Sequence, residues 1–136
     1  MSAEPEIGSP LPNAHLARTD PRKFTEYALD PDSERGRDKA RVFRSALGFG
    51  SEDWETLRDR ILADLFLRPV RGKSLGPYPT YSVIVLVDGI SDTRAWVVTA
   101  WQMRDGNPWL VTLRVATEAQ QKSLDDEHPD AVPSTR

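Results

Sequence analysis

Three runs of β-branched and aromatic residues in the second half of the chain constrain the fold most. They read TYSVIVLV (80–87), RAWVVTAWQM (94–103) and WLVTLRV (109–115). The links between them, DGISDT and RDGNP, are typical turn sequences and are too short to hold a crossover helix. The runs therefore predict antiparallel strands joined by hairpins, and a further strand is expected near residues 68–74.

The first half of the chain has helical spacing instead. Helices are expected over about 21–30, 36–47 and 52–68, each with proline or glycine at its end. Their predicted core faces hold Phe24, Tyr27 and Ala28, then Ala40, Phe43, Ala46 and Leu47, then Trp54, Leu57, Ile61 and Leu65. The predicted fold class is α+β, with two to three N-terminal helices followed by an antiparallel three- to four-stranded sheet in two layers.

The length of 136 residues suggests one domain, and its two ends differ from the middle. Residues 1–13 hold three prolines and few large apolar side chains, and residues 118–136 are acidic. Both are expected to be tails that are disordered or lie loosely on the surface, which leaves 14–117 as the α+β domain. The start of the chain lacks the pattern of a signal peptide, and no apolar run is long enough to span a membrane. A cytoplasmic protein without a membrane partner is expected.

The chain has no cysteine, which excludes disulfides, thiolate nucleophiles and cysteine zinc sites. Two separated histidines predict no metal site, and no cofactor is expected because Gly72-Lys73-Ser74 lacks the upstream glycine of a phosphate loop. The net charge of −3 argues against strong non-specific nucleic-acid binding. Residues 35–44, however, carry five cations and one acid, whereas 118–130 carry one lysine and five acids. The acidic segment either screens the basic one or only aids solubility.

Helical spacing divides the basic segment into two features. Arg37, Arg41 and Arg44 recur at intervals of four and three residues and form an outward stripe. This stripe is either a solvated face or a phosphate-binding surface, since guanidinium groups match phosphate oxygens. Lys39 falls on the flank of the buried face. It either extends its ammonium to water or lies in a cleft and takes part in acid–base chemistry or charge stabilisation.

Other candidate residues lie outside this helix. Arg71 and Lys73 are followed by two tyrosines, a combination typical either of nucleic-acid binding or of a polar connector. His15 is a candidate general acid or base. Arg114 interrupts an apolar strand, where it either faces solvent or lines a site.

The segments LPNAHLA, KFTEYALDPDSERGRDKARVFRSALGF and DWETLRDRIL resemble a bacterial family known as a domain of unknown function. Its members read Leu-Pro-Asn-Ala, then Tyr-x-Leu-(Asn or Asp)-Pro, then Gly-x-x-Lys-Ala-x-x-Phe and Leu-Gly. The matching residues are Leu11 to Ala14, Tyr27 to Pro31, Gly36 with Lys39, Ala40 and Phe43, and Leu47-Gly48. VVTAWQMRDGNPWLVTLRV is similar to the last two strands of that family, and the resemblance covers most of 11–116.

The order of helices and sheet in that family resembles the barnase, EndoU, colicin and RelE group of metal-independent ribonucleases. The resemblance implies RNA cleavage by Lys39, His15 and Arg114. It also implies a partner such as an immunity protein or antitoxin. Basic residues are expected at Val98 and Trp109 in relatives, so this chain departs from the pattern there.

The predicted function is therefore a metal-independent, toxin-type RNA-cleaving domain or a degenerate relative of one. The expected nucleic-acid contacts are Arg37, Arg41, Arg44, Arg71 and Lys73. A non-catalytic protein-interaction module is the alternative.

Overall fold

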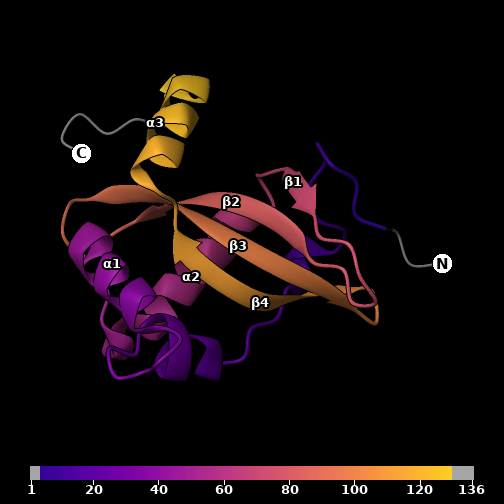
Figure 1. Cartoon of the computed structure of the whole chain (residues 1–136). Helices are drawn as coiled ribbons and strands as arrows, with labels where there is room; N and C mark the ends of the chain where they lie inside the picture. Colours follow the sequence, from indigo (N-terminus) through magenta and orange to yellow (C-terminus); the bar gives the residue numbers. More distant parts are fainter. Residues whose placement is uncertain (1–3, 130–136) are drawn as a thin grey trace.

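Four antiparallel strands form one sheet in the structure, a computed structural model that describes residues 4–129 (Figure 1). The strands are β1 (Val70–Lys73), β2 (Tyr81–Asp88), β3 (Arg94–Arg104) and β4 (Asn107–Val115), and they lie side by side in chain order. Two helices precede them, α1 (Arg37–Leu47) and α2 (Trp54–Leu65). The predicted α+β class is confirmed, and β1 is the strand expected near 68–74.

The helices differ in how closely they follow the prediction. Helix α1 ends where expected, because Gly48 adopts the left-handed conformation with φ 76°. Helix α2 is preceded by the 3₁₀ turn η3 (Ser51–Asp53). The helix expected over 21–30 is instead one wide turn, the π-helix η2 (Phe24–Ala28). It ends before Pro31 is reached, because Leu29 already leaves helical geometry with φ −113° and ψ 5°.

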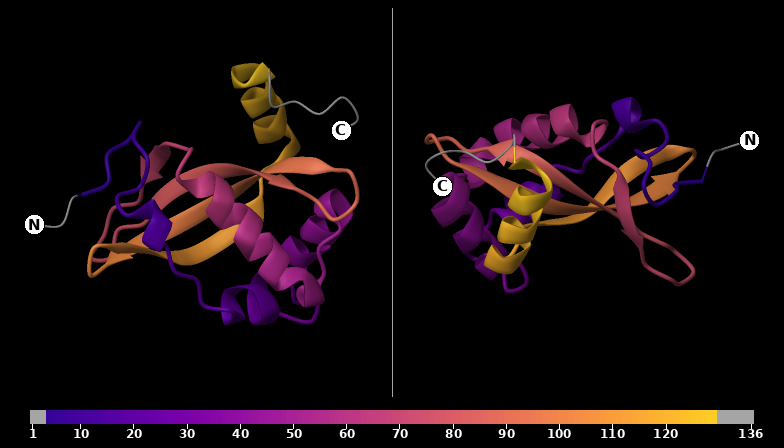
Figure 2. Two further views of the ribbon diagram at one scale, coloured as in Figure 1. Left: turned by 180° about the vertical axis from the view of Figure 1, so that it is seen from behind. Right: turned by 90° about the horizontal axis from the view of Figure 1, so that it is seen from above.

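One face of the sheet is covered by α1, α2 and η2, and the main core lies between them (Figure 2). The helical side chains predicted to face it are buried at Phe24, Ala28, Ala40, Phe43, Leu47, Leu57, Ile61 and Leu65. Thr99 is fully buried on this face, where its hydroxyl donates to the Val83 carbonyl at 2.6 Å. The indole Nε1 of Trp101 donates in turn to the Thr99 oxygen at 2.7 Å. This pair satisfies both polar groups inside an apolar core.

The opposite face is covered in part by α3 (Glu118–Glu127), which lies outside the main core (Figure 1). Thr117 caps this helix, and Leu124 is buried against Trp96. The Gln121 amide also hydrogen-bonds both the N–H and the carbonyl of Trp96, at 2.8 Å each. The prediction of disorder from 118 onwards was therefore wrong for 118–127, because a cap and these contacts order the segment; residues 130–136 lie outside the described residues.

The N-terminal segment is also ordered where it is described. Ile7 and Val70 form a parallel bridge, in which Gly8 N–H donates to the Val70 carbonyl at 2.8 Å. Leu11 is buried in the main core, and the chain then crosses to β4, where Arg18 forms a second parallel bridge with Trp109. The prediction of disorder over 1–13 was thus wrong for these residues, whereas 1–3 lie outside the described part.

An irregularity interrupts the pairing of β3 with β4. Thr112 lies opposite Ala100 and Leu110 opposite Trp101, so Val111 has no partner and forms a bulge. A bulge locally increases strand twist and redirects side chains.

Between residues 4 and 129, no helix is long and apolar enough to cross a membrane.

Candidate functional site

A tyrosine, a lysine and a threonine from three separate elements meet beside α1. Lys39 on α1 donates through its Nζ to the Tyr27 hydroxyl of η2 at 2.5 Å and to Thr112 Oγ1 of β4 at 3.0 Å. The same nitrogen lies 4.5 Å from the centre of the Tyr27 ring. Lys39 is half-buried, as the helical period predicted. Its ammonium is held by polar partners rather than extended to water.

Local sequence explains why these side chains converge. Gly36 lies against the backbone of Tyr27, and a Cβ at position 36 would be 1.8 Å from the Tyr27 carbonyl oxygen. Only glycine therefore allows the start of α1 to approach η2 so closely. Lys39 follows by three residues and reaches the ring of Tyr27. Thr112 comes directly after the bulge at Val111, and its hydroxyl lies within hydrogen-bond distance of Lys39 on the same helix.

The environment of Tyr27 changes its acidity. Burial alone would raise the pKa of Tyr27. The hydrogen bonds with Lys39 and Thr112, and the positive charges of Lys39 and Lys23, outweigh burial and lower the pKa below its ordinary value of 10.0. A phenol with a lowered pKa accepts and returns a proton more readily near neutral pH, so the arrangement suits acid–base chemistry.

Tyr27 and Thr112 open onto a cleft of about 460 Å³. Its wall includes the cations Lys23 and Arg35. A third cation, Arg22, is neutralised by Asp20 at 2.8 Å, and this hydrogen bond lowers the pKa of Asp20 to about 2. Glu26 and Val111 complete the lining. With Arg22 and Asp20 paired, Lys23 and Arg35 exceed Glu26 by one positive charge, so the cleft around Tyr27 is suited to an anionic substrate.

The structure does not bring the three predicted catalytic residues together. His15 lies in the exposed 3₁₀ turn η1 (Ala14–Leu16), and it is not among the residues that line the cleft. Arg114 contacts α3 instead, where it donates to Gln120 Oε1 at 3.0 Å. Lys39 alone belongs to the cluster with Tyr27.

The predicted nucleic-acid contacts are likewise divided. Arg71 and Lys73 lie on β1, at the opposite edge of the sheet from β4. Arg71 forms an ion pair with Glu127 of α3 at 2.5 Å, and Lys73 lies over the Tyr81 ring. The acidic segment thus contacts β1 rather than the arginines of α1 in the part of the chain that is described. Those arginines line a separate groove on another side of α1.

Sequence reasoning missed Tyr27 and Thr112 as site residues. Tyr27 was assigned to a core face, although a half-buried lysine needs a polar partner, and the preceding helix offered a hydroxyl. Strand alternation places Thr112 and Arg114 on one face, yet Thr112 contacts α1 and Arg114 contacts α3. The bulge at Val111 precedes both residues, and it has no glycine or other signal in the sequence. Within residues 4–129, no group of three or more His, Asp or Glu side chains is placed to hold a metal ion.

Comparison with known families gives a match. The family model described as a domain of unknown function (DUF6883) matches residues 10–117. These residues include both η2 and α1, which carry the cluster, and they end where α3 begins. No curated protein and no solved structure matches the chain.

Proposed function

The chain belongs to DUF6883, a family of unknown function, and from the geometry of its Tyr27–Lys39 pair we propose that it cleaves RNA by acid–base chemistry. The observation that carries the proposal is the Tyr27 hydroxyl itself. Its pKa is lowered, it is bonded to Lys39, and Tyr27 lines a cleft whose charged side chains are three cations and two acids. The resemblance to metal-independent ribonucleases supports the same chemistry.

In the proposed reaction, Tyr27 acts as the general base. Its phenolate takes the proton of the ribose 2′-hydroxyl, and the 2′-oxygen attacks the adjacent phosphorus. The bond from phosphorus to the 5′-oxygen breaks with its electron pair, and water protonates that oxygen. The products are a 2′,3′-cyclic phosphate and a 5′-hydroxyl, and the proton held by Tyr27 neutralises the hydroxide formed from water.

The cations of the site have separate roles in this scheme. Lys39 stabilises the phenolate before the reaction and the negative charge of the phosphorane during it. Lys23 and Arg35 bind the phosphate oxygens at the wall of the cleft. Thr112 positions Lys39 through its hydroxyl.

The test is cleavage of a defined single-stranded RNA by the full chain in the presence of EDTA. Tyr27→Phe and Lys39→Met are expected to lower the rate about 100-fold or more, the usual contribution of a general base. Tyr78→Phe is the matched control, since it removes the hydroxyl of an exposed tyrosine outside the cleft. His15→Gln and Arg114→Gln are expected to change the rate less than tenfold. RNA left intact by the wild type, or cut equally by Tyr27→Phe, would refute the proposal.

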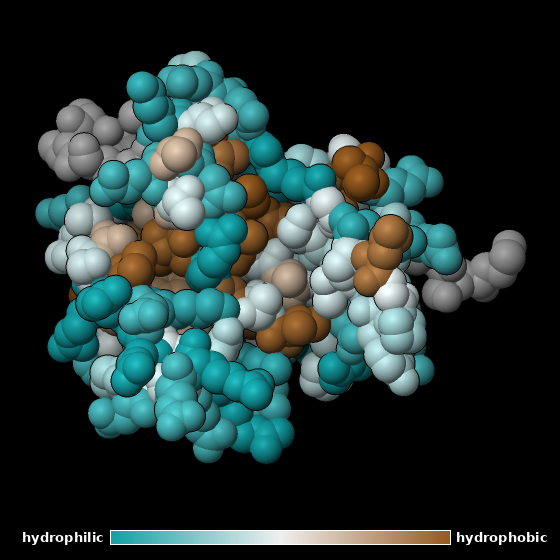
Figure 3. Space-filling model, viewed as in Figure 1, coloured by the Kyte–Doolittle hydropathy of each residue, from teal (hydrophilic) through white to brown (hydrophobic). Residues whose placement is uncertain are grey.

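A non-catalytic interaction module is the second candidate, and one surface favours it. A groove of about 790 Å³ lies between α1 and α3, with Val42, Ala46, Ala95 and Val115 among its lining residues. Figure 3 shows an apolar area between these two helices. The departures at Val98 and Trp109 from the basic residues expected in relatives also favour this candidate. It predicts no RNA affinity at moderate salt and a stable complex with an antitoxin-type protein that Val42→Asp weakens.

A further inference from the structure

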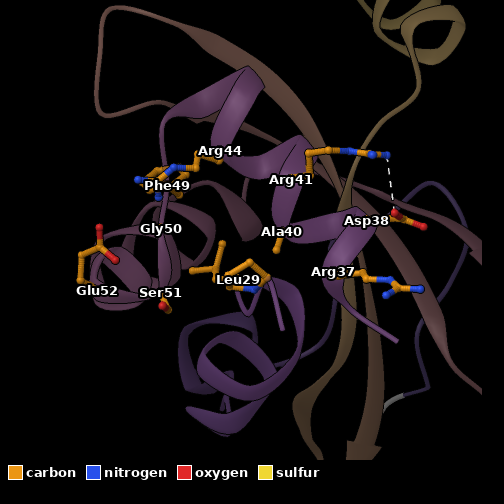
Figure 4. Close-up of a pocket in the computed structure, with 11 residues that line it drawn as sticks. Leu29, Arg37, Asp38, Ala40, Arg41, Arg44, Phe49, Gly50, Ser51 and Glu52 are labelled. Carbon is orange, nitrogen blue, oxygen red and sulfur yellow. Dashed lines mark ion pairs between the residues drawn. The ribbon is translucent and has the colours of Figure 1, made fainter. Parts of the chain in front are cut away.

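A second basic depression lies on the other side of α1 from Lys39. This groove has a volume of about 640 Å³, and Arg37, Arg41 and Arg44 line it from α1 (Figure 4). The same three arginines were predicted to form one stripe. The opposite wall is formed by Phe49 and the segment 50–52, so the stripe borders a hollow rather than a convex surface.

The positive charge of this groove is only partly balanced by its acids, and Arg44 Nη1 and the Glu52 carboxylate lie 2.6 and 2.7 Å from the position that a Cβ at Gly50 would take. Arg41 is 3.5 Å from Asp38, but both side chains are about four-fifths exposed, so this ion pair is weak. Over residues 4–129 no ion pair is recorded for Arg37 or Arg44. Glu52 adds one acid on the far wall, which leaves three arginines facing two carboxylates. The groove therefore favours an anion.

The spacing of the arginines indicates the shape of that anion. Arg37 and Arg44 are seven residues apart on one helix, which places them about 10 Å apart along its axis. Arg41 lies between them. Their guanidinium groups do not converge on one point, since Arg37 and Arg41 extend to one side of the groove and Arg44 to the other (Figure 4). They therefore suit the successive phosphates of a nucleic-acid backbone better than a single small anion.

The groove and the Tyr27 cleft approach each other at the start of α1. Arg35 lines the cleft and Arg37 lines the groove, with only the buried Gly36 between them. A nucleic-acid strand that leaves the cleft across Gly36 reaches the arginines of the groove next. Only a flexible strand can bend over a helix end in this way, because a duplex is stiff over much longer distances.

We propose that the substrate is single-stranded RNA that runs from the Tyr27 cleft over the start of α1 into the arginine groove. This inference rests on the proposed function, since it takes the cleft as the cleavage site. The groove then supplies affinity through the flanking phosphates, and the cleft supplies chemistry.

The experiment measures binding without cleavage. The full-length wild type is titrated with a fluorescent single-stranded RNA whose 2′-hydroxyls are methylated, over a series of salt concentrations. Each of Arg37→Gln, Arg41→Gln and Arg44→Gln is expected to lower the slope of log affinity against log salt by about 0.7, and the triple variant by about 2. Lys122→Gln is the control, because it removes one charge from an exposed position of α3, and its slope is expected to stay unchanged.

The outcomes separate this inference from the proposed function. Unchanged slopes for the arginine variants would refute RNA binding by the groove, even if Tyr27→Phe abolishes cleavage. Equal binding of duplex RNA with the same loss of slope overturns the single-strand assignment. Tighter binding of polyglutamate than of RNA, lost in the same variants, assigns the groove to an acidic protein and also overturns the inference. Lowered slopes with intact RNA support the groove and refute only the chemistry.

Discussion

Lys39 illustrates how much a single residue reveals from sequence. The helical period put it on the flank of the buried face, and the structure has it half-buried there. Its partners could not be derived in the same way. Tyr27 meets it only because Gly36 lets two elements pack closely, and Thr112 lies 73 residues further along the chain, on β4. Both depend on contacts between distant segments, which local patterns do not encode.

The acidity of Tyr27 is expected to depend on Lys39. In the wild type the tyrosinate forms at a pH below 10.0, and cleavage is expected to rise with pH toward that midpoint because the deprotonated phenol is the base. Lys39→Met removes a hydrogen bond and a charge but leaves burial, which raises the pKa, so the midpoint is expected to move above its wild-type value. Ultraviolet titration of tyrosinate measures this, with Tyr27→Phe to assign the signal. An unchanged midpoint in Lys39→Met would contradict the account.

We expect the same substitution, threonine to valine, to have different effects on stability at two positions near the sheet. Thr99→Val leaves the buried Trp101 N–H without its acceptor, so a loss of about 1–3 kcal/mol in unfolding free energy is expected. The buried Thr93 hydroxyl has no hydrogen-bond partner in the structure, so Thr93→Val is expected to be neutral or stabilising. Denaturant unfolding compares the two variants. A loss of unfolding free energy for Thr99→Val no larger than that for Thr93→Val would show that the Trp101–Thr99 hydrogen bond contributes little to stability.

At the scale of elements, the strands of the sheet were predictable from sequence, whereas helix α3, which packs on one of its faces, was not. Strand β2 alternates buried and partly buried residues, and β3 does so over 97–102. The ranges of both were predictable from β-branched and aromatic runs bounded by turn sequences. Helix α3 lacks such a pattern, since Leu124 is its only buried residue and much of its attachment comes from side-chain hydrogen bonds. Polar composition predicted disorder there because composition does not record such bonds.

The attachment of α3 can be measured through Leu124. Leu124→Ala opens the contact with Trp96 and is expected to cost about 2 kcal/mol, near the lower limit for buried leucines because the site is close to the surface. Lys122→Ala, exposed on the same helix, is expected to change stability by less than about 0.5 kcal/mol. Denaturant unfolding, followed by tryptophan fluorescence, distinguishes the two. A cost equal to that of Lys122→Ala would mean that α3 contributes no packing energy.

At the scale of the whole molecule, charge is separated in space. The arginines of α1 and the acidic helix α3 are adjacent to different grooves, and Glu127 neutralises Arg71 on the far edge of the sheet. The net charge of −3 therefore hides a local positive surface along α1. Sequence reasoning found both charge clusters, but their arrangement relative to the sheet required the fold.

The N-terminal segment forms hydrogen bonds with both outer strands of the sheet, through Ile7–Ser9 at β1 and through Arg18 at β4. Arg18→Pro removes the N–H that donates to the Pro108 carbonyl at 2.8 Å, whereas Arg18→Ala keeps it. Light scattering on heating is expected to show concentration-dependent self-association of Arg18→Pro at lower temperature than of Arg18→Ala. The same onset for both would argue against a protective role.

Unpaired outer strands are templates for pairing with other molecules and hence for aggregation. In this chain, residues 7–18 hydrogen-bond to part of β1 and part of β4, the two outer strands. A nascent chain makes this stretch before the four strands, so it is already present when the strands form. Proteolysis or fusion near residue 18 would therefore threaten the solubility of the protein before it disturbed the Tyr27 site.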